Sequence, residues 1–250
     1  MNLGPAIGGG PPPGSGESVD DRLRRIWQRA VDCRQALPGE HALAAALGVS
    51  RPIVREHLAR LEHEGLISRR RGAGTVVNVA AGDIDVRFDM QIDYAKLLRK
   101  LGHRVKVEVL SAAIGPMASC DHEFFEVPGE WSRLEVVKRW RADEDVLVLA
   151  DDVLAVPPDV HLENLDLSLE VAALVEQIRG TATEWTIAEP GAAVVEGVVA
   201  EQFERPVGSV ALTIEVTGVG LDGTRLFRAR ELHVPGGVRF GFIRSRQADE

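Results

Sequence analysis

Arginine is the residue type in this chain whose spacing most directly suggests chemistry. Arg51 and Arg55 lie four residues apart, and three consecutive arginines follow at 69–71. In the second half of the chain, Arg139 and Arg141 flank a tryptophan. A guanidinium group presents a planar fork of donors that matches phosphate, carboxylate and base edges. These positions are therefore candidates for contacts with nucleic acid or with an anionic small molecule.

Catalytic and metal-binding patterns are not recognisable in the sequence. No nucleophile is paired with a base, and there is no phosphate-binding loop. Cys33 and Cys120 are far apart and lack the spacing of metal ligands, which also makes a disulfide framework implausible. We therefore expect no metal, no cofactor and a function other than catalysis.

Charge is distributed unevenly along the chain. The total is -9 over 250 residues, yet residues 18–82 hold 11 arginines and no lysine against 7 acidic residues, a balance of +4. The remaining residues carry -13. This asymmetry predicts a basic module joined to an acidic one, and it argues against a protein that coats nucleic acid or membrane throughout.

The N-terminal residues and the length of the apolar runs indicate where in the cell the protein is expected. Residues 1–18 are rich in glycine and proline, which predicts a flexible tail, and they lack the basic and apolar regions of a signal peptide. No apolar run approaches the length of a membrane-spanning helix. We therefore expect a cytoplasmic protein that makes no membrane contact.

The basic module shows the apolar periodicity of three helices. The first is expected over 20–31, and Pro38–Gly39 then breaks the pattern before a short helix over 40–47. The turn at 48–50 supplies a glycine for the left-handed position and a serine for the next N-cap. A third helix over 51–64 tolerates a proline in its first turn, where no backbone hydrogen bond is lost.

The third expected helix has a buried stripe and an outward arginine stripe. At about 100° per residue, Val54, Leu58 and Leu61 share the buried side. The segment 66–77 then alternates around two glycines, as a two-stranded β-wing requires. This order predicts a winged helix-turn-helix over 19–78, with the third helix in the major groove of DNA. A solvated arginine face or a charged turn could explain either feature alone, but not the ordered combination.

The stretch LPGEHALAAALGVSRPIVREHLARLEHEGLISRRRGAGTVV closely resembles the DNA-binding domain of the GntR superfamily of bacterial transcription regulators. The resemblance implies base contacts from two recognition-helix arginines and a phosphate contact from the serine before them. The chain departs from the family pattern at His41, where arginine is common, and at Pro52 and Ile53, where threonines are common. The DNA-binding residues implied by the resemblance are His41, Ser50, Arg51, Pro52, Arg55, Arg70, Arg71 and Gly72.

The acidic module is expected to consist mainly of strands. Strand-like runs lie at 105–114, 132–142, 145–156, 181–192, 209–220, 224–234 and 238–245. Helical segments are expected at 94–102, 168–180 and 192–204. Consecutive strands interrupted by helices predict an antiparallel sheet with helices packed on it, an α+β domain.

Residues 90–246 resemble the UTRA domain of the HutC-like branch of the same superfamily. The motifs "YAKLLRKLGH", R-x-R-A-D, "LDLSLEVAALVEQ" and "FERPVGSVALTIEVTGVGLDGTRL" occur in the expected order. UTRA domains share the fold of chorismate lyase and bind small effectors. The effector-binding residues implied by the resemblance are Arg139, Arg141, Asp152, Ser168, Glu170 and His233.

Three of the implied pocket positions differ from the family pattern. Glu170 and His233 stand where tyrosine is common, and Phe227 stands where glutamate is common. A pocket that combines two arginines with additional acidic groups would suit a carboxylate or zwitterionic metabolite rather than a sugar phosphate.

The sequence therefore predicts a ligand-responsive DNA-binding transcription regulator. It would act as a repressor that binds a palindromic operator as a homodimer and is released by a small anionic or zwitterionic metabolite. The expected parts are a tail at 1–18, a winged helix-turn-helix at 19–78, a linker at 79–89 and an effector-binding, dimerising domain at 90–246. Two alternatives stay open: a chorismate-lyase-like enzyme activity in the second domain, and a regulator with a vestigial sensor pocket.

Overall fold

The computed structural model describes residues 18–70 and 74–244, with only the backbone of Arg70. The predicted tail lies outside these ranges except for its last residue, and the predicted wing tip at 71–73 lies outside them as well. No helix in the described ranges is long and apolar enough to cross a membrane.

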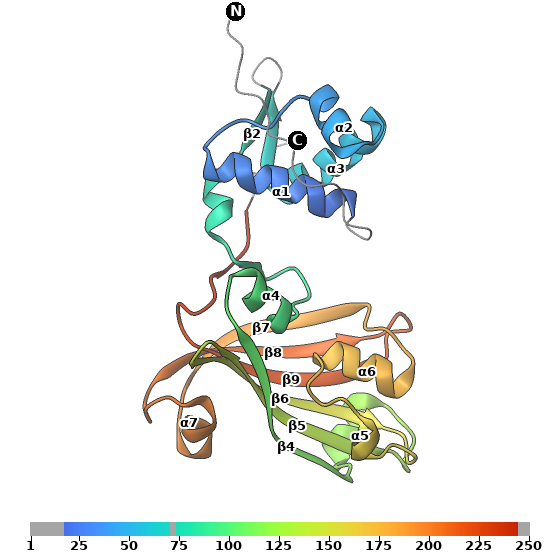
Figure 1. The fold of residues 1–250 in the computed structure, drawn as a ribbon. Helices are drawn as coiled ribbons and strands as arrows, with labels where there is room; N and C mark the ends of the chain where they lie inside the picture. Colours follow the sequence, from blue (N-terminus) through green and yellow to red (C-terminus); the bar gives the residue numbers. More distant parts are fainter. Residues whose placement is uncertain (1–17, 71–73, 245–250) are drawn as a thin grey trace, which may run out of the picture. The chain divides into compact units, whose positions relative to one another are not determined.

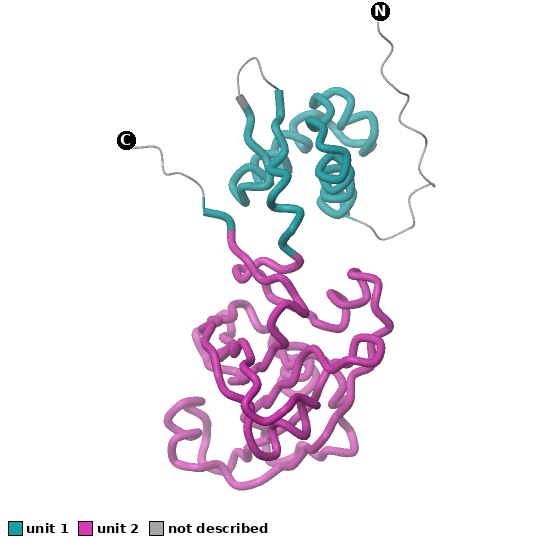
Figure 2. Tube along the Cα trace, turned by 90° about the vertical axis from the view of Figure 1, so that its left-hand side faces the viewer, with its two compact units in different colours: residues 1–84, 243–250 teal, residues 85–242 magenta. Residues whose placement is uncertain are grey.

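The chain forms two compact units (Figure 2). One comprises Met1–Ile84 together with Ile243–Glu250, and the other comprises Asp85–Phe242. Part of the segment expected to be a linker, residues 79–84, thus groups with the first unit. The domain limits given by the sequence otherwise stay predictions.

The first unit is a three-helix domain with a two-stranded wing (Figure 1). Its elements are α1 (Val19–Asp32), α2 (Glu40–Leu47), α3 (Arg51–His63), β1 (Ile67–Arg70), β2 (Gly74–Val77) and the 3-10 turn η1 (Val79–Asp83). Strands β1 and β2 pair in an antiparallel register. The predicted order of helices and wing is therefore confirmed.

Local residue choice explains where these helices begin and end. Ser18 and Asp21 form a capping box at the start of α1. Gly48 takes a φ of 67° after α2, a left-handed conformation that costs glycine little. Ser50 is the N-cap of α3, and Pro52 lies in its first turn.

One apolar core holds the first unit together. The fully buried side chains of α1, α2 and α3 meet, and the indole N–H of Trp27 donates to the carbonyl of Leu66 at 2.9 Å. Near the other end of the chain, Ile243 packs against this core. The buried members include Leu23, Trp27, Leu43, Leu47, Val54, Leu58 and Leu61.

The second unit is built on one six-stranded antiparallel sheet with the strand order β4-β5-β6-β9-β8-β7 (Figure 1). The strands are β4 (Val105–Pro116), β5 (Ser132–Ala142), β6 (Asp145–Val156), β7 (Trp185–Val194), β8 (Val210–Val219) and β9 (Arg225–His233). A separate parallel pair joins β3 (Val86–Arg87) to β10 (Phe240–Gly241). This architecture confirms the predicted α+β class.

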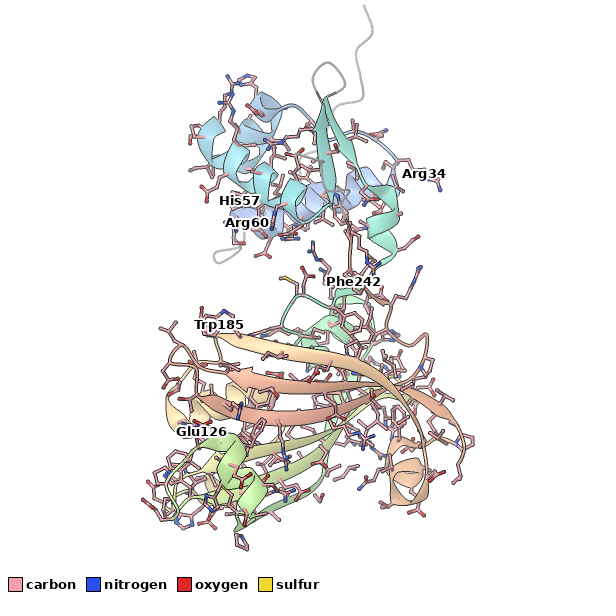
Figure 3. All side chains as sticks on the ribbon, turned by 180° about the vertical axis from the view of Figure 1, so that it is seen from behind. Arg34, His57, Arg60, Glu126, Trp185 and Phe242 are labelled. Carbon is pink, nitrogen blue, oxygen red and sulfur yellow. The ribbon has the colours of Figure 1, made fainter. Side chains whose placement is uncertain are left out.

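Helices cover both faces of this sheet. They are α4 (Tyr94–Lys100), α5 (Ser119–Phe125), α6 (Val171–Arg179) and α7 (Gly197–Phe203), with a 3-10 turn η2 (Leu162–Asn164) before α6. Helices α4 and α6 pack on the face that carries Val136 and Trp140 of β5, whereas α5 and α7 pack on the other face. Figure 3, which views the sheet from behind relative to Figure 1, brings α5 and α7 to the front.

Three local expectations in this unit were wrong. The helix expected over 192–204 begins only at Gly197, because residues 192–194 continue β7 and pair with β8. The expected terminal strand shortens to two residues, β10, because β3, its one partner, has only two residues. Helix α5 was not expected, and Phe125 anchors it in the core.

Candidate DNA interface and sheet pocket

The outward face of α3 presents the two predicted recognition arginines. The side chains of Arg51 and Arg55 are each 57% exposed. Both approach the same carboxylate oxygen of Glu40, the first residue of α2: Arg51 Nη2 at 3.4 Å and Arg55 Nε at 2.8 Å. The hydrogen bond from Arg55 lowers the pKa of Glu40 below its usual range. In this arrangement one carboxylate orients two guanidinium groups over the first turns of α3.

Of the other residues predicted to contact DNA, three lie in the described part of the structure and three do not, or only in part. His41, Ser50 and Pro52 are exposed near the start of α2 and α3. Ser50 makes no side-chain capping bond, so its hydroxyl is not committed to the helix. The side chain of Arg70, and Arg71 and Gly72 altogether, lie outside the described residues.

The base of the wing is attached to α3. Both the backbone N–H and the Nε of Arg69 donate to Glu62 at 2.7 Å. This double contact joins β1 to α3. Arg69 is therefore a structural arginine in the described part of the wing.

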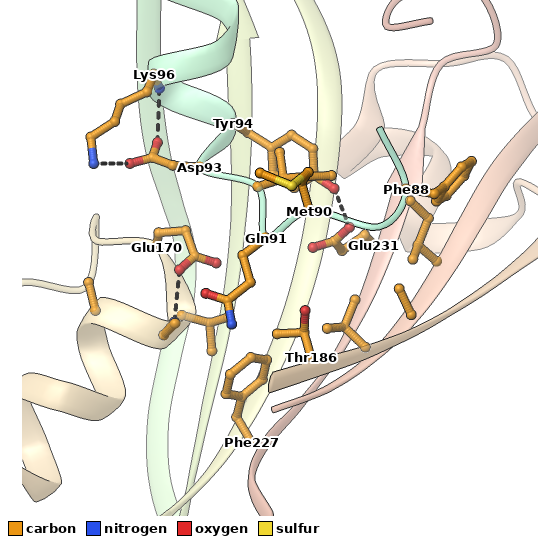
Figure 4. A pocket seen from close by; sticks show the side chains of 17 residues that line it. Phe88, Met90, Gln91, Asp93, Tyr94, Lys96, Glu170, Thr186, Phe227 and Glu231 are labelled. Atoms are coloured by element: carbon orange, nitrogen blue, oxygen red, sulfur yellow. Dashed lines mark hydrogen bonds and ion pairs between the residues drawn. The ribbon is translucent and has the colours of Figure 1, made fainter. Parts of the chain in front are cut away.

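The sheet face beneath α4 and α6 contains a cavity of about 280 Å³, here called the sheet pocket (Figure 4). The segment 88–96, the first turn of α6 and strands β7, β8 and β9 form its walls. Apolar side chains supply most of the lining, among them Phe88, Met90 and Phe227. A cavity of this size and composition fits a small ligand.

Two carboxylates reach the sheet pocket from different elements. Glu170 is the N-cap of α6, and its Oε2 accepts the backbone N–H of Ala172 at 2.9 Å. Glu231 comes from β9, and its Oε2 accepts the hydroxyl of Tyr94 at 2.5 Å (Figure 4). Burial raises the pKa of Glu170 to about 7, and the charges of Asp152 and Glu231 add to this effect.

A buried ion pair lies deeper on the same face of the sheet. Lys138 Nζ is 2.9 Å from Asp152, and their side chains are 0% and 2% exposed. The same ammonium donates to the carbonyl of Leu169, the residue before Glu170. Burial raises the pKa of Asp152, while the neighbouring ammonium opposes that rise. The pair therefore links β5, β6 and the start of α6.

The predicted effector residues do not form one pocket. Arg139 and Arg141 lie on the opposite face of β5, where Arg139 binds Glu108 at 2.7 Å and both arginines bind Glu204 of the α7 end, at 2.9 and 2.6 Å. Strand alternation explains this outcome, because residues 138 and 140 already occupy the pocket face. Arg139 and Arg141 therefore do not share a pocket with Glu170, contrary to the expectation from the sequence.

The remaining members of the predicted set occupy three positions. Ser168 is exposed and donates its hydroxyl to Asp166 at 2.6 Å. Asp152 and His233 are buried below the cavity, and His233 contacts Glu231 at 3.1 Å. Only Glu170 of the six lines the sheet pocket.

Three polar residues at or beneath the sheet pocket were not among the residues predicted from the sequence. Tyr94 is the one tyrosine of the sequence, and Glu231 alternates with His233 along β9. Lys138, between valines and a tryptophan in the run VVKRW, interrupts an otherwise apolar alternation. An ionisable residue at a core position of a strand is the signal that could have found it.

An aromatic chain extends from the pocket floor to the β3–β10 pair. Ring centroids lie 5.1 Å apart for Tyr94 and His233, 4.9 Å for His233 and Phe240, and 5.0 Å for Phe240 and Phe88. Phe88 also lines the pocket. The pocket wall and the short parallel pair are thus one packed structure within the second unit.

These features define a class of protein: a winged helix-turn-helix joined to an antiparallel-sheet domain that holds a small-molecule-sized pocket. The family profile described as "Bacterial regulatory proteins, gntR family" matches residues 16–77. The N-terminal domain is a GntR-family helix-turn-helix domain.

Curated relatives named as regulators match part of the chain. The chain is 42% identical over 108 residues to the uncharacterised HTH-type transcriptional regulator Rv0494 of Mycobacterium tuberculosis, which covers 40% of this chain and 43% of the relative. It is 44% identical over 62 residues to a putative L-lactate dehydrogenase operon regulatory protein of Escherichia coli, covering 24% of each. The chain thus spans less than half the length of these relatives.

Solved structures match the fold of both units. The possible transcriptional regulator YydK from Bacillus subtilis aligns with a TM-score of 0.66 at 14% identity, over 91% of this chain and 97% of that one. PhnF from Mycobacterium smegmatis aligns with a TM-score of 0.56 at 18% identity, over 92% of this chain and 100% of that one. The effector domain of PhnF alone gives a TM-score of 0.55 at 14% identity, covering 64% of this chain and 100% of that domain.

Proposed function

We propose that the protein is a ligand-responsive transcription regulator of the cytoplasm. It binds operator DNA through α3 and the wing, and it binds a small metabolite in the sheet pocket. The observation that carries this proposal is the exposed pair Arg51 and Arg55 on the outward face of α3, within a GntR-family domain. An arginine near the start of a recognition helix can donate two hydrogen bonds to a base edge in the major groove.

The proposed regulator is a homodimer that recognises a palindromic operator. Strand β7, which carries the labelled Trp185 (Figure 3), is an edge of the large sheet. Trp185 and Ile187 are 52% and 57% exposed. Large apolar side chains along an unpaired edge favour association with another copy. Two-fold symmetry then places two recognition helices on two half-sites of inverted sequence.

Repression with release by a metabolite is the mode we propose. Ligand binding can shift DNA affinity only to the extent that the ligand prefers one conformation of the protein. The sheet pocket offers a binding site with polar groups on a packed framework, which supports a working sensor over a vestigial one. A lyase-like enzyme has less support, because none of the described residues that line the pocket is an arginine that could hold a dicarboxylate.

Selection of binding sites from a randomised duplex library with the full chain tests this function. We expect recovery of an inverted repeat, and one dimer per recovered site by sedimentation. Ile187→Asp should yield a monomer with weakened operator binding, while Val109→Asp on the opposite edge strand β4 should remain a dimer. Recovery of no preferred sequence, or turnover of chorismate to pyruvate by the purified chain, would contradict the proposal.

A further inference from the structure

The charged residues that line the sheet pocket are mostly acidic. Asp93, Glu170 and Glu231 line it together with one cation, Lys96. Lys96 is 82% exposed and pairs with Asp93 at 3.0 Å, at the rim of the pocket (Figure 4). This rim pair is neutral overall, so the interior is left with the carboxylates of Glu170 and Glu231.

Each interior carboxylate has one oxygen committed to the protein and one oxygen free. Oε2 of Glu231 receives both the Tyr94 hydroxyl and the contact from His233. Oε2 of Glu170 receives the backbone N–H of Ala172. Within the described part of the chain, Oε1 of Glu170 and Oε1 of Glu231 have no hydrogen-bond partner. Neither oxygen is among the fully buried side-chain atoms that lack a partner, so both are open to the cavity and available to donors that a ligand brings.

The polar groups near the pocket floor are already engaged. The ammonium of Lys138 is in contact with Asp152 at 2.9 Å and also donates to the carbonyl of Leu169. His233 contacts Glu231 on the oxygen that Tyr94 also binds. Burial raises the pKa of Glu170 to about 7; the charges of Asp152 and Glu231 add to the rise, and the ammonium of Lys138 opposes it.

The rest of the lining is apolar and aromatic. Phe88 and Phe227 contribute rings, while Met90, Ile214 and Val216 contribute aliphatic or thioether surface. Such a lining buries the hydrocarbon part of a ligand, and aromatic faces also tolerate a nearby cation. The pocket therefore combines an acidic end with an apolar body.

We propose that the sheet pocket binds an organic cation whose protonated amine donates to Oε1 of Glu170 and of Glu231, while its hydrocarbon part packs against Phe88, Met90 and Phe227. The inference rests on the proposed sensor role of this domain, and it replaces the anionic effector expected from Arg139 and Arg141. Those arginines lie on the far face of β5 and are neutralised by Glu108 and Glu204.

Calorimetric titration of the full chain at pH 8 tests the ligand class. The probes are two matched sets: 2-phenylethylammonium, 2-phenylethanol and 3-phenylpropionate, and butylammonium, butanol and butyrate. We expect the better of the two amines to bind about tenfold or more tightly than its matched alcohol and acid, because only the amine supplies charged donors to the carboxylates.

Variants of the two carboxylates identify the site. Glu170→Gln keeps an oxygen for the α6 cap, and Glu231→Gln keeps an oxygen for Tyr94, so both variants should fold. Each should lower amine affinity about tenfold and leave alcohol affinity within about twofold, since each removes one charge from the contact. Glu189→Gln, on β7 and outside the pocket lining, should have no effect.

Several results would overturn the inference. They are binding of neither amine, equal or tighter binding of the matched acids, and amine binding that survives both pocket substitutions. Operator binding by the same samples separates this inference from the proposed function. A chain that binds its operator but no amine contradicts the ligand class alone, whereas a chain that binds the amine but shows no DNA sequence preference contradicts the regulator function alone.

Discussion

The carboxylate of Glu40 accepts a hydrogen bond from the Nε of Arg55 at 2.8 Å, so the first residue of α2 holds a recognition arginine of α3. The same oxygen lies 3.4 Å from Arg51. The two helices of the motif are thus connected at the surface proposed to face DNA, in addition to their apolar contact. The contact orients the guanidinium groups and at the same time places a negative charge beside the expected phosphate path.

Glu40→Gln separates these two effects. We expect tighter binding to non-specific duplex, by about fivefold or less at low salt, because a negative charge is removed from the binding surface. The ratio of operator to non-specific affinity should fall, because the amide oxygen of Gln accepts only a weaker, uncharged hydrogen bond from Arg55. Fluorescence anisotropy with operator and scrambled duplexes measures both, and an unchanged ratio would show that Glu40 does not orient the arginines.

Lys138→Met should strongly destabilise the second unit. The substitution leaves Asp152 buried without its ion-pair partner, and such a loss costs about 3–5 kcal/mol. Urea unfolding at pH 7 measures the change. Arg230→Met provides a matched control, because its pair with Glu215 is more than half exposed and should contribute about 0–1 kcal/mol. Similar losses in the two variants would contradict the assigned burial.

Glu170 should make the stability of the second unit fall as pH rises from about 4.5 to about 7. Its pKa is raised to about 7 in the folded protein, so over this range the folded state holds a proton that the unfolded chain releases. The effect amounts to about 3 kcal/mol for a shift of this size. The charged groups that act on Glu170 are Lys138, Asp152 and Glu231.

Comparison with Glu170→Gln isolates this titration. The variant cannot ionise, so its free energy of unfolding minus that of the wild type should be larger at pH 8 than at pH 5, while the other groups cancel. Urea unfolding at several pH values gives this difference. A difference that does not change with pH would show that Glu170 titrates normally in the fold.

The DNA-binding unit was accessible from the sequence because its determinants are local. Gly48, Ser50 and Pro52 fix the turn and the start of α3 within five residues, and the buried stripe follows from helical spacing. The structure confirms each of these elements. The exposed arginines then follow from the same helix geometry.

The sheet pocket was not accessible in the same way because its parts are distant in sequence. Tyr94 and Glu231 are 137 positions apart, and only the completed sheet brings them together. Alternation alone places Arg139 and Arg141 on one face of β5 and Lys138 on the other. It cannot show which face has the pocket, because helices cover both.

Operator binding by Arg55→Ala and by Arg60→Ala, measured by fluorescence anisotropy, shows whether the outward face of α3 reads the operator. Both substitutions remove an exposed arginine from α3, but residue 60 lies about half a turn around the helix from residue 51 and faces away from the proposed DNA surface. If this face reads the operator, Arg55→Ala loses about 1–3 kcal/mol of binding and relaxes base preference, with little change for Arg60→Ala. Equal operator affinity for Arg55→Ala and the wild type would show that it does not.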